Sequence, residues 1–243
     1  MVGAVQNRSH LATLTIRMEM NMEARAAYTQ RLRNAKDEVV LMGSMVEKSL
    51  ARAIEALKNR DSGLAHQIIA DDATINEKRF YIEKRCIELI AKDQPAENDL
   101  IVIVAILNII VELERIGDYA EGIAKIVIMI GDEPPLKPLI DIPRMNEITI
   151  QMIREGLKAF IESDTKLATQ VISMDSTVDS LYDQIFRELL TFMMADPKTI
   201  NRATRLIWVA HNLERAADRA TNICERVVFT VTGKMEELGA SRY

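Results

Sequence analysis

The chain has 243 residues and a net charge of −5, from 31 Lys and Arg against 36 Asp and Glu. A mildly acidic chain lacks the basic footprint needed to wrap nucleic acid, so we exclude that class of protein. Only 9 glycines and 6 prolines interrupt a composition rich in Ala, Leu, Ile, Met, Glu and Arg, which favours an all-α fold. The two cysteines, Cys86 and Cys224, exclude a disulfide scaffold, and we expect small buried thiols in a reducing compartment, because no signal peptide is visible.

Six long amphipathic helices are expected, in two groups of three. The breaks between them lie at residues 59–63, 93–95, 131–143, 163–164 and 196–197. Asp61 or Ser62, and later Asp164 and Asp196, stand where N-caps are needed, and Pro197 suits a first helical turn. The break after residue 130 holds four of the six prolines and cannot be helical throughout.

These breaks divide the chain into five expected segments. They are a flexible N-terminal tail (1–23), a first three-helix bundle (24–131), a Pro-rich linker (132–140), a second three-helix bundle (141–232) and a C-terminal tail (233–243). The first tail shows no clear hydrophobic period, and a start codon further along the chain would explain it.

The longest apolar run, Leu100–Val111, is apolar around the whole helix. Its length of about 12 residues is short of the roughly 20 that cross a bilayer, so no membrane span is expected. Such a helix must be covered on more than one side, either by the other half of the chain or by a second subunit. Between these two, we expect a homodimer.

The two halves repeat one another in sequence. With a shift of 103 residues, Asp61, Leu64, Ala65, Gln67, Ile69, Asp72 and Thr74 meet Asp164, Leu167, Ala168, Gln170, Ile172, Asp175 and Thr177. With a shift of 100, Leu113, Glu114, Arg115, Asp118, Ala120, Ile123 and Val127 meet Leu213, Glu214, Arg215, Asp218, Ala220, Ile223 and Val227. Helix breaks and apolar phases coincide as well, which indicates a tandem duplication of a three-helix unit and two bundles related by a pseudo-twofold axis.

Acidic residues gather on one face of the third and sixth helices, away from the apolar stripe. At 100° per residue, Glu114, Asp118 and Glu121 share a face of the third helix, and Glu214, Asp218 and Asn222 share a face of the sixth. Antiparallel hairpins bring residues equally far from the turn to one level. Counting from the turns near residues 95 and 196 places Asp72 and Asn76 beside Asp118 and Glu114, and Asp175 and Asp179 beside Asp218 and Glu214.

Clustered carboxylates repel one another unless a cation neutralises them. An all-oxygen set suits a hard ion such as iron(III), manganese, magnesium or calcium. We therefore expect a metal ion or small cluster in each half, weaker in the first because Asn76 replaces a carboxylate. The alternative is a set of solvated acids paired along their own helices, namely Asp118 with Arg115, Asp218 with Arg215 and Glu121 with Lys125.

Catalytic signatures are missing from the sequence. A di-iron oxidase or iron-storage bundle needs Glu-x-x-His, and the residues at that distance before the three histidines are Asn7, Gly63 and Trp208. No P-loop, dinucleotide, nucleophile-elbow or zinc-finger motif occurs either. We expect no enzymatic activity; a metal store or carboxylate-bridged oxidase is the alternative, and a metal-free helical adaptor is a third possibility.

Two stretches, Leu113–Ala124 and Asn212–Arg226, resemble the paired signatures of the PhoU family. That family motif has an acidic residue followed four positions later by Asp, and it maps to Glu114/Asp118 and Glu214/Asp218. The resemblance implies two three-helix bundles and iron or zinc clusters at these acids. Ala216–Ala217 stands where Ile–Gly is common, which leaves the acids in place.

The resemblance also implies a function, that of an accessory and regulatory protein of the bacterial high-affinity phosphate transport system. Such a protein is a cytoplasmic negative regulator without catalysis of its own. Its implied partners are the ATPase subunit of a phosphate ABC transporter and a membrane sensor histidine kinase. It damps phosphate uptake and phosphate-starvation signalling when phosphate is plentiful.

Overall fold

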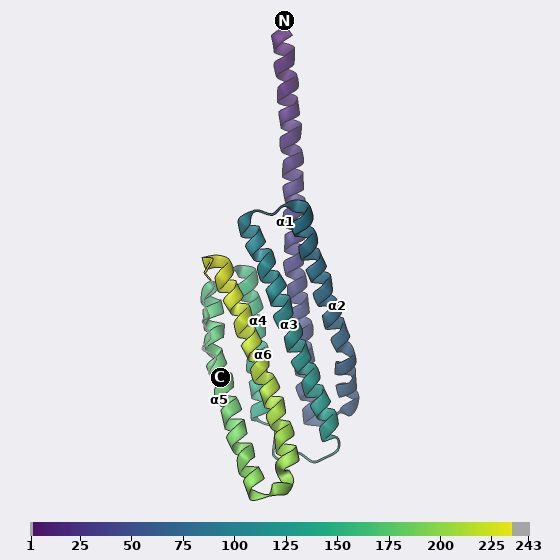
Figure 1. The fold of residues 1–243 in the computed structure, drawn as a ribbon, viewed down its shortest axis with the longest axis vertical. Helices are drawn as coiled ribbons and strands as arrows, with labels where there is room; N and C mark the ends of the chain where they lie inside the picture. Colours follow the sequence, from purple (N-terminus) through teal and green to yellow (C-terminus); the bar gives the residue numbers. More distant parts are fainter. Residues whose placement is uncertain (1, 235–243) are drawn as a thin grey trace.

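The computed structural model describes the backbone of residues 2–234 and the side chains of residues 25–234. Across this part of the chain the fold is all-α, with no strand (Figure 1). The elements are α1 (Val2–Asn59), α2 (Ser62–Asp93), α3 (Glu97–Ile130), α4 (Asp141–Glu162), α5 (Thr165–Ala195), the 3-10 helix η1 (Pro197–Thr199) and α6 (Ile200–Thr232). The predicted class and the six long helices are confirmed.

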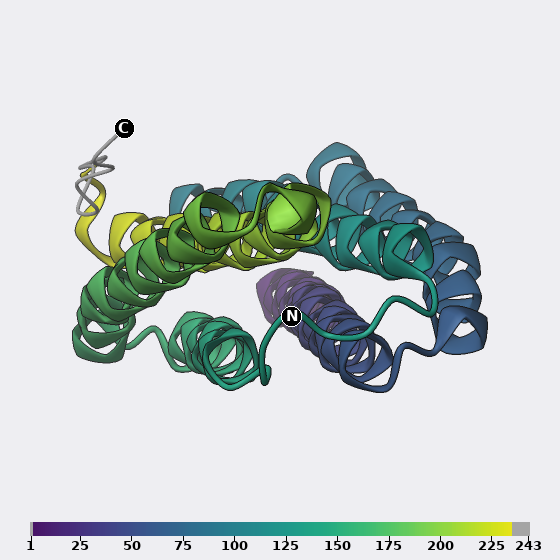
Figure 2. The same ribbon diagram turned by 90° about the horizontal axis from the view of Figure 1, so that it is seen from below.

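The helices form two three-helix bundles, α1–α3 and α4–α6, packed side by side. Helices of one bundle all contact one another, and the bundles meet only through α1 against α4 and α3 against α6 in the described chain. Seen along the bundles, α2, α3, α6 and α5 form one layer while α1 and α4 form a second (Figure 2). Because first helix meets first helix and third meets third, the predicted pseudo-twofold relation of the halves is confirmed.

A glycine allows close approach at each contact between the bundles. A Cβ added to Gly43 on α1 would lie 2.1 Å from Cδ1 of Leu157 on α4. A Cβ added to Gly122 on α3 would lie 2.9 Å from Oδ1 of Asn212 on α6. Both distances are shorter than a van der Waals contact, so the missing side chain is what admits the neighbouring one.

Helix boundaries follow the predicted caps. The side chains of Asp61 and Asp164 accept hydrogen bonds from the backbone N–H three residues on, at 2.8 and 3.0 Å. Asp196 accepts from the N–H of Lys198 at 3.0 Å and precedes the short turn that opens with Pro197. Gly131 ends α3 with φ of +59°, a backbone conformation that favours glycine.

The N-terminal end differs from the sequence prediction. Residues 2–24 were expected in a flexible tail, yet α1 begins at Val2, and Figure 1 shows this end of the helix extending beyond the bundle. A segment outside the bundle has no core to face, which explains the lack of an apolar period; its Ala, Met, Glu and Arg residues still favour a helix. Residue 1 and residues 235–243 of the predicted tails lie outside the described part of the chain.

The apolar run on α3 is covered largely from within the chain. Its buried members are Ile103, Ala105, Ile106, Ile109 and Ile110. Helix α3 contacts α1, α2 and α6, so a helix that serves two bundles needs apolar residues around most of its circumference. Leu100, Val104 and Val111 remain 39%, 39% and 36% exposed. No helix in the described residues is long and apolar enough to span a membrane.

Both cysteines are buried, as expected. Burial raises the pKa of the Cys86 thiol and that of the Cys224 thiol to about 12. The thiols therefore stay protonated and act as small apolar side chains in the core.

Truncation of α3 in the core tests this arrangement. Ile109 is fully buried, and Ile109→Ala is expected to lower the free energy of unfolding by about 2–5 kcal/mol, because the deleted methyl groups leave a cavity. Ile87→Ala on α2, where the side chain is 56% exposed, serves as the control and should cost less than about 0.5 kcal/mol. Urea titration followed by circular dichroism measures both; equal effects would contradict the assigned core.

Candidate functional site

The α2–α3 hairpin brings Asp72 to the level predicted from loop counting. Oδ1 of Asp72 lies 3.4 Å from the position that a Cβ on Gly117 would take, one residue before Asp118. Burial raises the pKa of Asp72 above its ordinary value, and repulsion by Glu121, Asp118 and Glu114 adds to the effect. The structure thus gathers the predicted residues of the first half, here called the first cluster: Asp72, Asn76, Glu114, Asp118 and Glu121.

Each acid of the first cluster has a partner of opposite charge or a hydrogen-bond donor. The contacts are Asn76 Nδ2 to Asp72 Oδ2 at 2.9 Å, Arg79 Nη1 to Glu114 Oε1 at 3.7 Å, Arg115 Nη1 to Asp118 Oδ2 at 3.2 Å, and Lys125 Nζ to Glu121 Oε2 at 2.6 Å. Repulsion among the four carboxylates is therefore offset by side chains of the same bundle.

The α5–α6 hairpin builds the second cluster from Asp175, Asp179, Glu214, Asp218 and Asn222. Arg215 Nη1 lies 2.8 Å from Asp218 Oδ2, matching the pair of the first half. Oδ1 of Asp175 and Oε2 of Glu214 are buried without a hydrogen-bond partner. Nδ1 of His211 is 3.4 Å from that Glu214 oxygen, but burial lowers the pKa of His211, so the ring is a poor counter-charge.

Burial and mutual repulsion raise the pKa values of the second cluster. Burial, with Asp218 adding, raises the pKa of Glu214 to about 7. Burial and the neighbouring Asp179 and Asp218 raise the pKa of Asp175 to about 6. Burial also raises the pKa of Asp218 against the opposing effect of Arg215. A cation placed among these groups would stabilise the charged carboxylates and so oppose these upward shifts.

The donor chemistry of both clusters suits a hard cation, and the second cluster has the more open oxygen donors. Carboxylate oxygens are the ligands that such ions prefer, and only the second cluster has buried carboxylate oxygens without hydrogen-bond partners in the described residues. A cavity of about 200 Å³ opens beside it, lined by Asp175, Arg215, Asp218, Arg219, Thr221, Asn222 and Glu225. Still, no three His, Cys, Asp or Glu side chains between residues 25 and 234 are arranged to hold a metal ion.

The alternative to metal binding, in which the acids pair with basic residues of their own helices, predicted three ion pairs that the structure contains. Asp118 with Arg115, Asp218 with Arg215 and Glu121 with Lys125 are all present. Metal binding at either cluster therefore stays a prediction. Its best support is the pair of unpartnered carboxylate oxygens in the second half.

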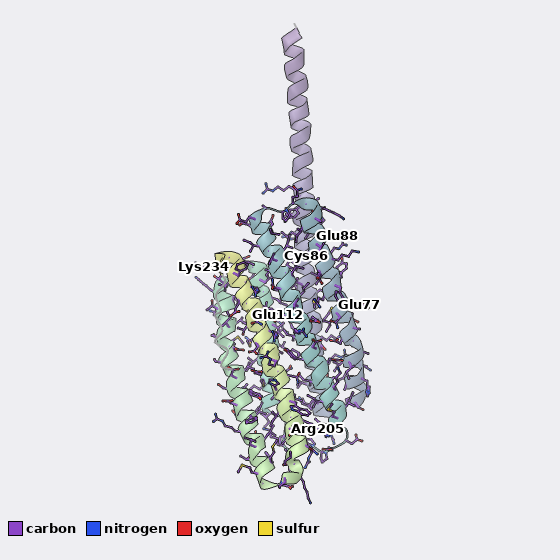
Figure 3. All side chains as sticks on the ribbon, in the orientation of Figure 1. Glu77, Cys86, Glu88, Glu112, Arg205 and Lys234 are labelled. Carbon is purple, nitrogen blue, oxygen red and sulfur yellow. The ribbon has the colours of Figure 1, made fainter. Side chains whose placement is uncertain are left out.

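Sequence reasoning missed a polar contact between the bundles. Glu112 on α3, labelled in Figure 3, lies where α3 passes α6. Its Oε2 accepts from Arg219 Nη1 at 3.4 Å and from Asn222 Nδ2 at 3.2 Å. Asn222, predicted beside the metal, thus borders the cavity while its amide bonds across to the other bundle. Loop counting aligns helices within a hairpin and carries no information on this contact.

Arg79 was also missed, although a signal for it exists. It follows Asp72 by seven residues, a spacing that keeps two side chains on one helix face. Its counterpart under the 103-residue shift is Tyr182, so the arginine is a difference between the halves, and a search for identities between them passes over it.

Removal of one repelling acid tests the electrostatics of the second cluster. With chelator present at pH 8, Glu214→Gln is expected to raise the free energy of unfolding by about 1–2 kcal/mol, because a neutral amide removes the cost of burying a charge and the repulsion by Asp218. A carboxyl with a raised pKa in the folded state stabilises below its ordinary pKa and loses this contribution as pH rises through about 7. The gain should therefore shrink towards pH 5. Urea titrations of both proteins measure it.

Glu55→Gln, at an exposed acid of α1, is the control and should change the free energy of unfolding by less than about 0.5 kcal/mol at either pH. A loss of stability in Glu214→Gln at pH 8 under chelation would contradict the proposed repulsion.

Comparison with known proteins identifies the family. A model of the PhoU domain matches the chain twice, over residues 39–127 and 142–227, which takes in both Glu/Asp pairs. The chain is 42% identical over 186 residues to the phosphate-specific transport system accessory protein PhoU homolog of Aquifex aeolicus, covering 76% of this chain and 84% of the relative. It is 41% identical to the homolog of Caulobacter vibrioides, covering 89% and 94%. The crystal structure of PhoU from Pseudomonas aeruginosa has a TM-score of 0.81 at 36% identity, covering 85% of this chain and all of that one. The chain therefore belongs to the PhoU family.

Proposed function

We propose that this chain is a negative regulator of phosphate homeostasis that couples a high-affinity phosphate ABC transporter to a sensor histidine kinase. The observation that carries the proposal is the family match over both halves, at relatives named as accessory proteins of the phosphate-specific transport system. When phosphate is plentiful, the protein damps uptake and phosphate-starvation signalling. It has no catalytic activity of its own, in keeping with an accessory role.

The partners in this proposal are the ATPase subunit of the transporter and the membrane-bound kinase. In this proposal the protein works in the cytoplasm and reaches the membrane only through these partners. Its acidic net charge of −5 favours basic partner surfaces and argues against nucleic acid.

A metal ion or small cluster is part of the proposal, at the second cluster. Asp175, Asp179, Glu214 and Asp218 would hold it, with Asn222 nearby. Iron or zinc is favoured by family resemblance, and magnesium, manganese or calcium would suit the oxygen donors. When bound, the cation supplies positive charge between α5 and α6, and this stabilises the folded state.

Deletion of the gene tests the regulatory role. Transcription of phosphate-starvation genes in phosphate-replete cells is expected to rise in the deletion strain and to return to normal with the intact gene on a plasmid. A tagged copy should retain the ATPase subunit and the kinase from cells grown in high phosphate. Normal repression in the deletion strain would contradict the role.

A homodimer is the proposed assembly, supported by an exposed apolar stripe on α3. Leu100, Val104 and Val111 are each more than a third exposed and share one face of α3 within about 40°. The prediction is a dimer by sedimentation at micromolar concentration and a monomer for Val104→Asp, because a buried unpaired carboxylate opposes association. Glu55→Gln should sediment as the unaltered protein does. A monomeric unaltered protein would contradict the dimer.

A further inference from the structure

We propose that Arg79 and Lys125 are built-in counter-cations of the first cluster, so that the first half holds its carboxylates together without a metal ion. Only the second half then takes a cation. The inference rests on the proposed cation at the second cluster. Repulsion among carboxylates is then offset by side chains in the first half and by a bound cation in the second.

Both residues are changed at the corresponding positions of the second half. Under the shift of 103, Arg79 corresponds to Tyr182; under the shift of 100, Lys125 corresponds to Glu225. The Tyr182 ring lies 6.1 Å from the His211 ring and 6.3 Å from that of Phe186, measured between centroids. The second half thus has an aromatic group and an acid where the first has two cations.

Both cations of the first half lie close to carboxylates that are sheltered from water. Lys125 Nζ is 2.6 Å from Glu121 Oε2, and the Glu121 side chain is 22% exposed. Arg79 Nη1 is 3.7 Å from Glu114 Oε1, and the Glu114 side chain is only 15% exposed. Partly buried charges are screened less by salt than exposed ones, so these pairs offset repulsion effectively.

Hydrogen bonding in the two clusters follows the same division. Asn76 stands where the second half has Asp179, and its amide donates to Asp72 at 2.9 Å, whereas Asp179 is a carboxylate. Within residues 25–234, buried carboxylate oxygens without a hydrogen-bond partner occur at Asp175 and Glu214, and none occurs in the first cluster. The paired arginines, Arg115 and Arg215, are common to both halves and do not explain the difference.

Arg219 does not replace the missing cations of the second half. It faces Asp218, yet its Nη1 hydrogen-bonds to Glu112 on α3. Its charge is therefore shared with an acid of the other bundle. A cation entering the first cluster would have to displace an ammonium or a guanidinium, whereas one entering the second would meet the unpartnered oxygens of Asp175 and Glu214.

Exchange of these residues between the halves tests the inference. The double variant Arg79→Tyr/Lys125→Glu gives the first cluster the side chains of the second at these two positions. It is expected to bind a further equivalent of Mn²⁺ per chain, counted from the electron paramagnetic resonance of free Mn²⁺. Its Tm should also rise with Mn²⁺ by about 5–10 °C more than that of the unaltered protein, at a hundredfold excess over Kd.

The control is Arg85→Tyr/Lys84→Glu, which makes the same change of charge at exposed positions of α2 and should leave Mn²⁺ stoichiometry unchanged. The reciprocal variant Tyr182→Arg/Glu225→Lys should lose the Mn²⁺ of the second half, as should Asp218→Asn. The inference would be overturned if Arg79→Tyr/Lys125→Glu bound no more Mn²⁺ per chain than the unaltered protein. It would also be overturned if Asp118→Asn bound less Mn²⁺ than the unaltered protein.

Failure of the proposed second site gives a different result. The unaltered protein and Asp218→Asn would then bind Mn²⁺ equally or not at all. A gained equivalent in Arg79→Tyr/Lys125→Glu would still support the counter-cation role. Melting in chelator adds an independent readout. The Tm of Arg79→Tyr/Lys125→Glu in chelator should be lower than that of the unaltered protein, whereas the two Tm values would be equal if Arg79 and Lys125 formed only surface ion pairs of negligible energy.

Discussion

Packing of α3 against α6 is the contact on which the other features depend. Each of these helices contacts both other long helices of its own bundle and also the third helix of the other bundle. Gly122 lets Asn212 approach at one place, and Glu112 receives Arg219 and Asn222 at another. Since Glu112 and Asn212 correspond under the 100-residue shift, the two places are related by the pseudo-twofold axis. The contact has the self-complementary form of a symmetric dimer, held within one chain.

Fusion of the two halves permits what a symmetric dimer forbids, because each copy can change alone. The Glu/Asp pairs of α3 and α6 are kept in both halves, while the residues facing them differ in charge. Equal scaffolds with unequal clusters are therefore the main physical result of the duplication. The family match over both halves shows that the scaffold is shared with relatives, while the difference in charge is read from this chain.

Fold and carboxylate positions were accessible from sequence because both depend on local rules. The apolar period predicted the helices, and Asp61 and Asp164 were predicted as N-caps. Equal distance from the turn predicted that Asp72 lies level with the residues around Asp118. The predicted start of the first helix at residue 24 was wrong, since α1 begins at Val2. A weak hydrophobic period indicates that a segment has no buried face, and it does not indicate that the segment is not helical.

The cross-bundle contacts of Glu112 and the pairing of Arg79 with Glu114 were not predicted. The first depends on how two separate hairpins meet, which spacing along the chain does not determine. The second depends on the reach and rotamer of a long side chain. The metal hypothesis was weighed against ion pairs along the same helices, and the structure contains those pairs.

The outer position of α2 and α5 has a consequence for motion. In the described chain α2 touches only α1 and α3, α5 touches only α4, α6 and the adjoining η1, and neither takes part in the contact between bundles. Either helix can therefore detach in a local unfolding event that leaves α1, α3, α4 and α6 packed together. Amide hydrogens of α2 and α5 would exchange with solvent through such openings, while those at the centre of α3 and α6 would wait for global unfolding. Each carboxylate cluster spans one outer and one inner helix. Repulsion or pairing among its charges therefore changes the free energy of opening the outer helix.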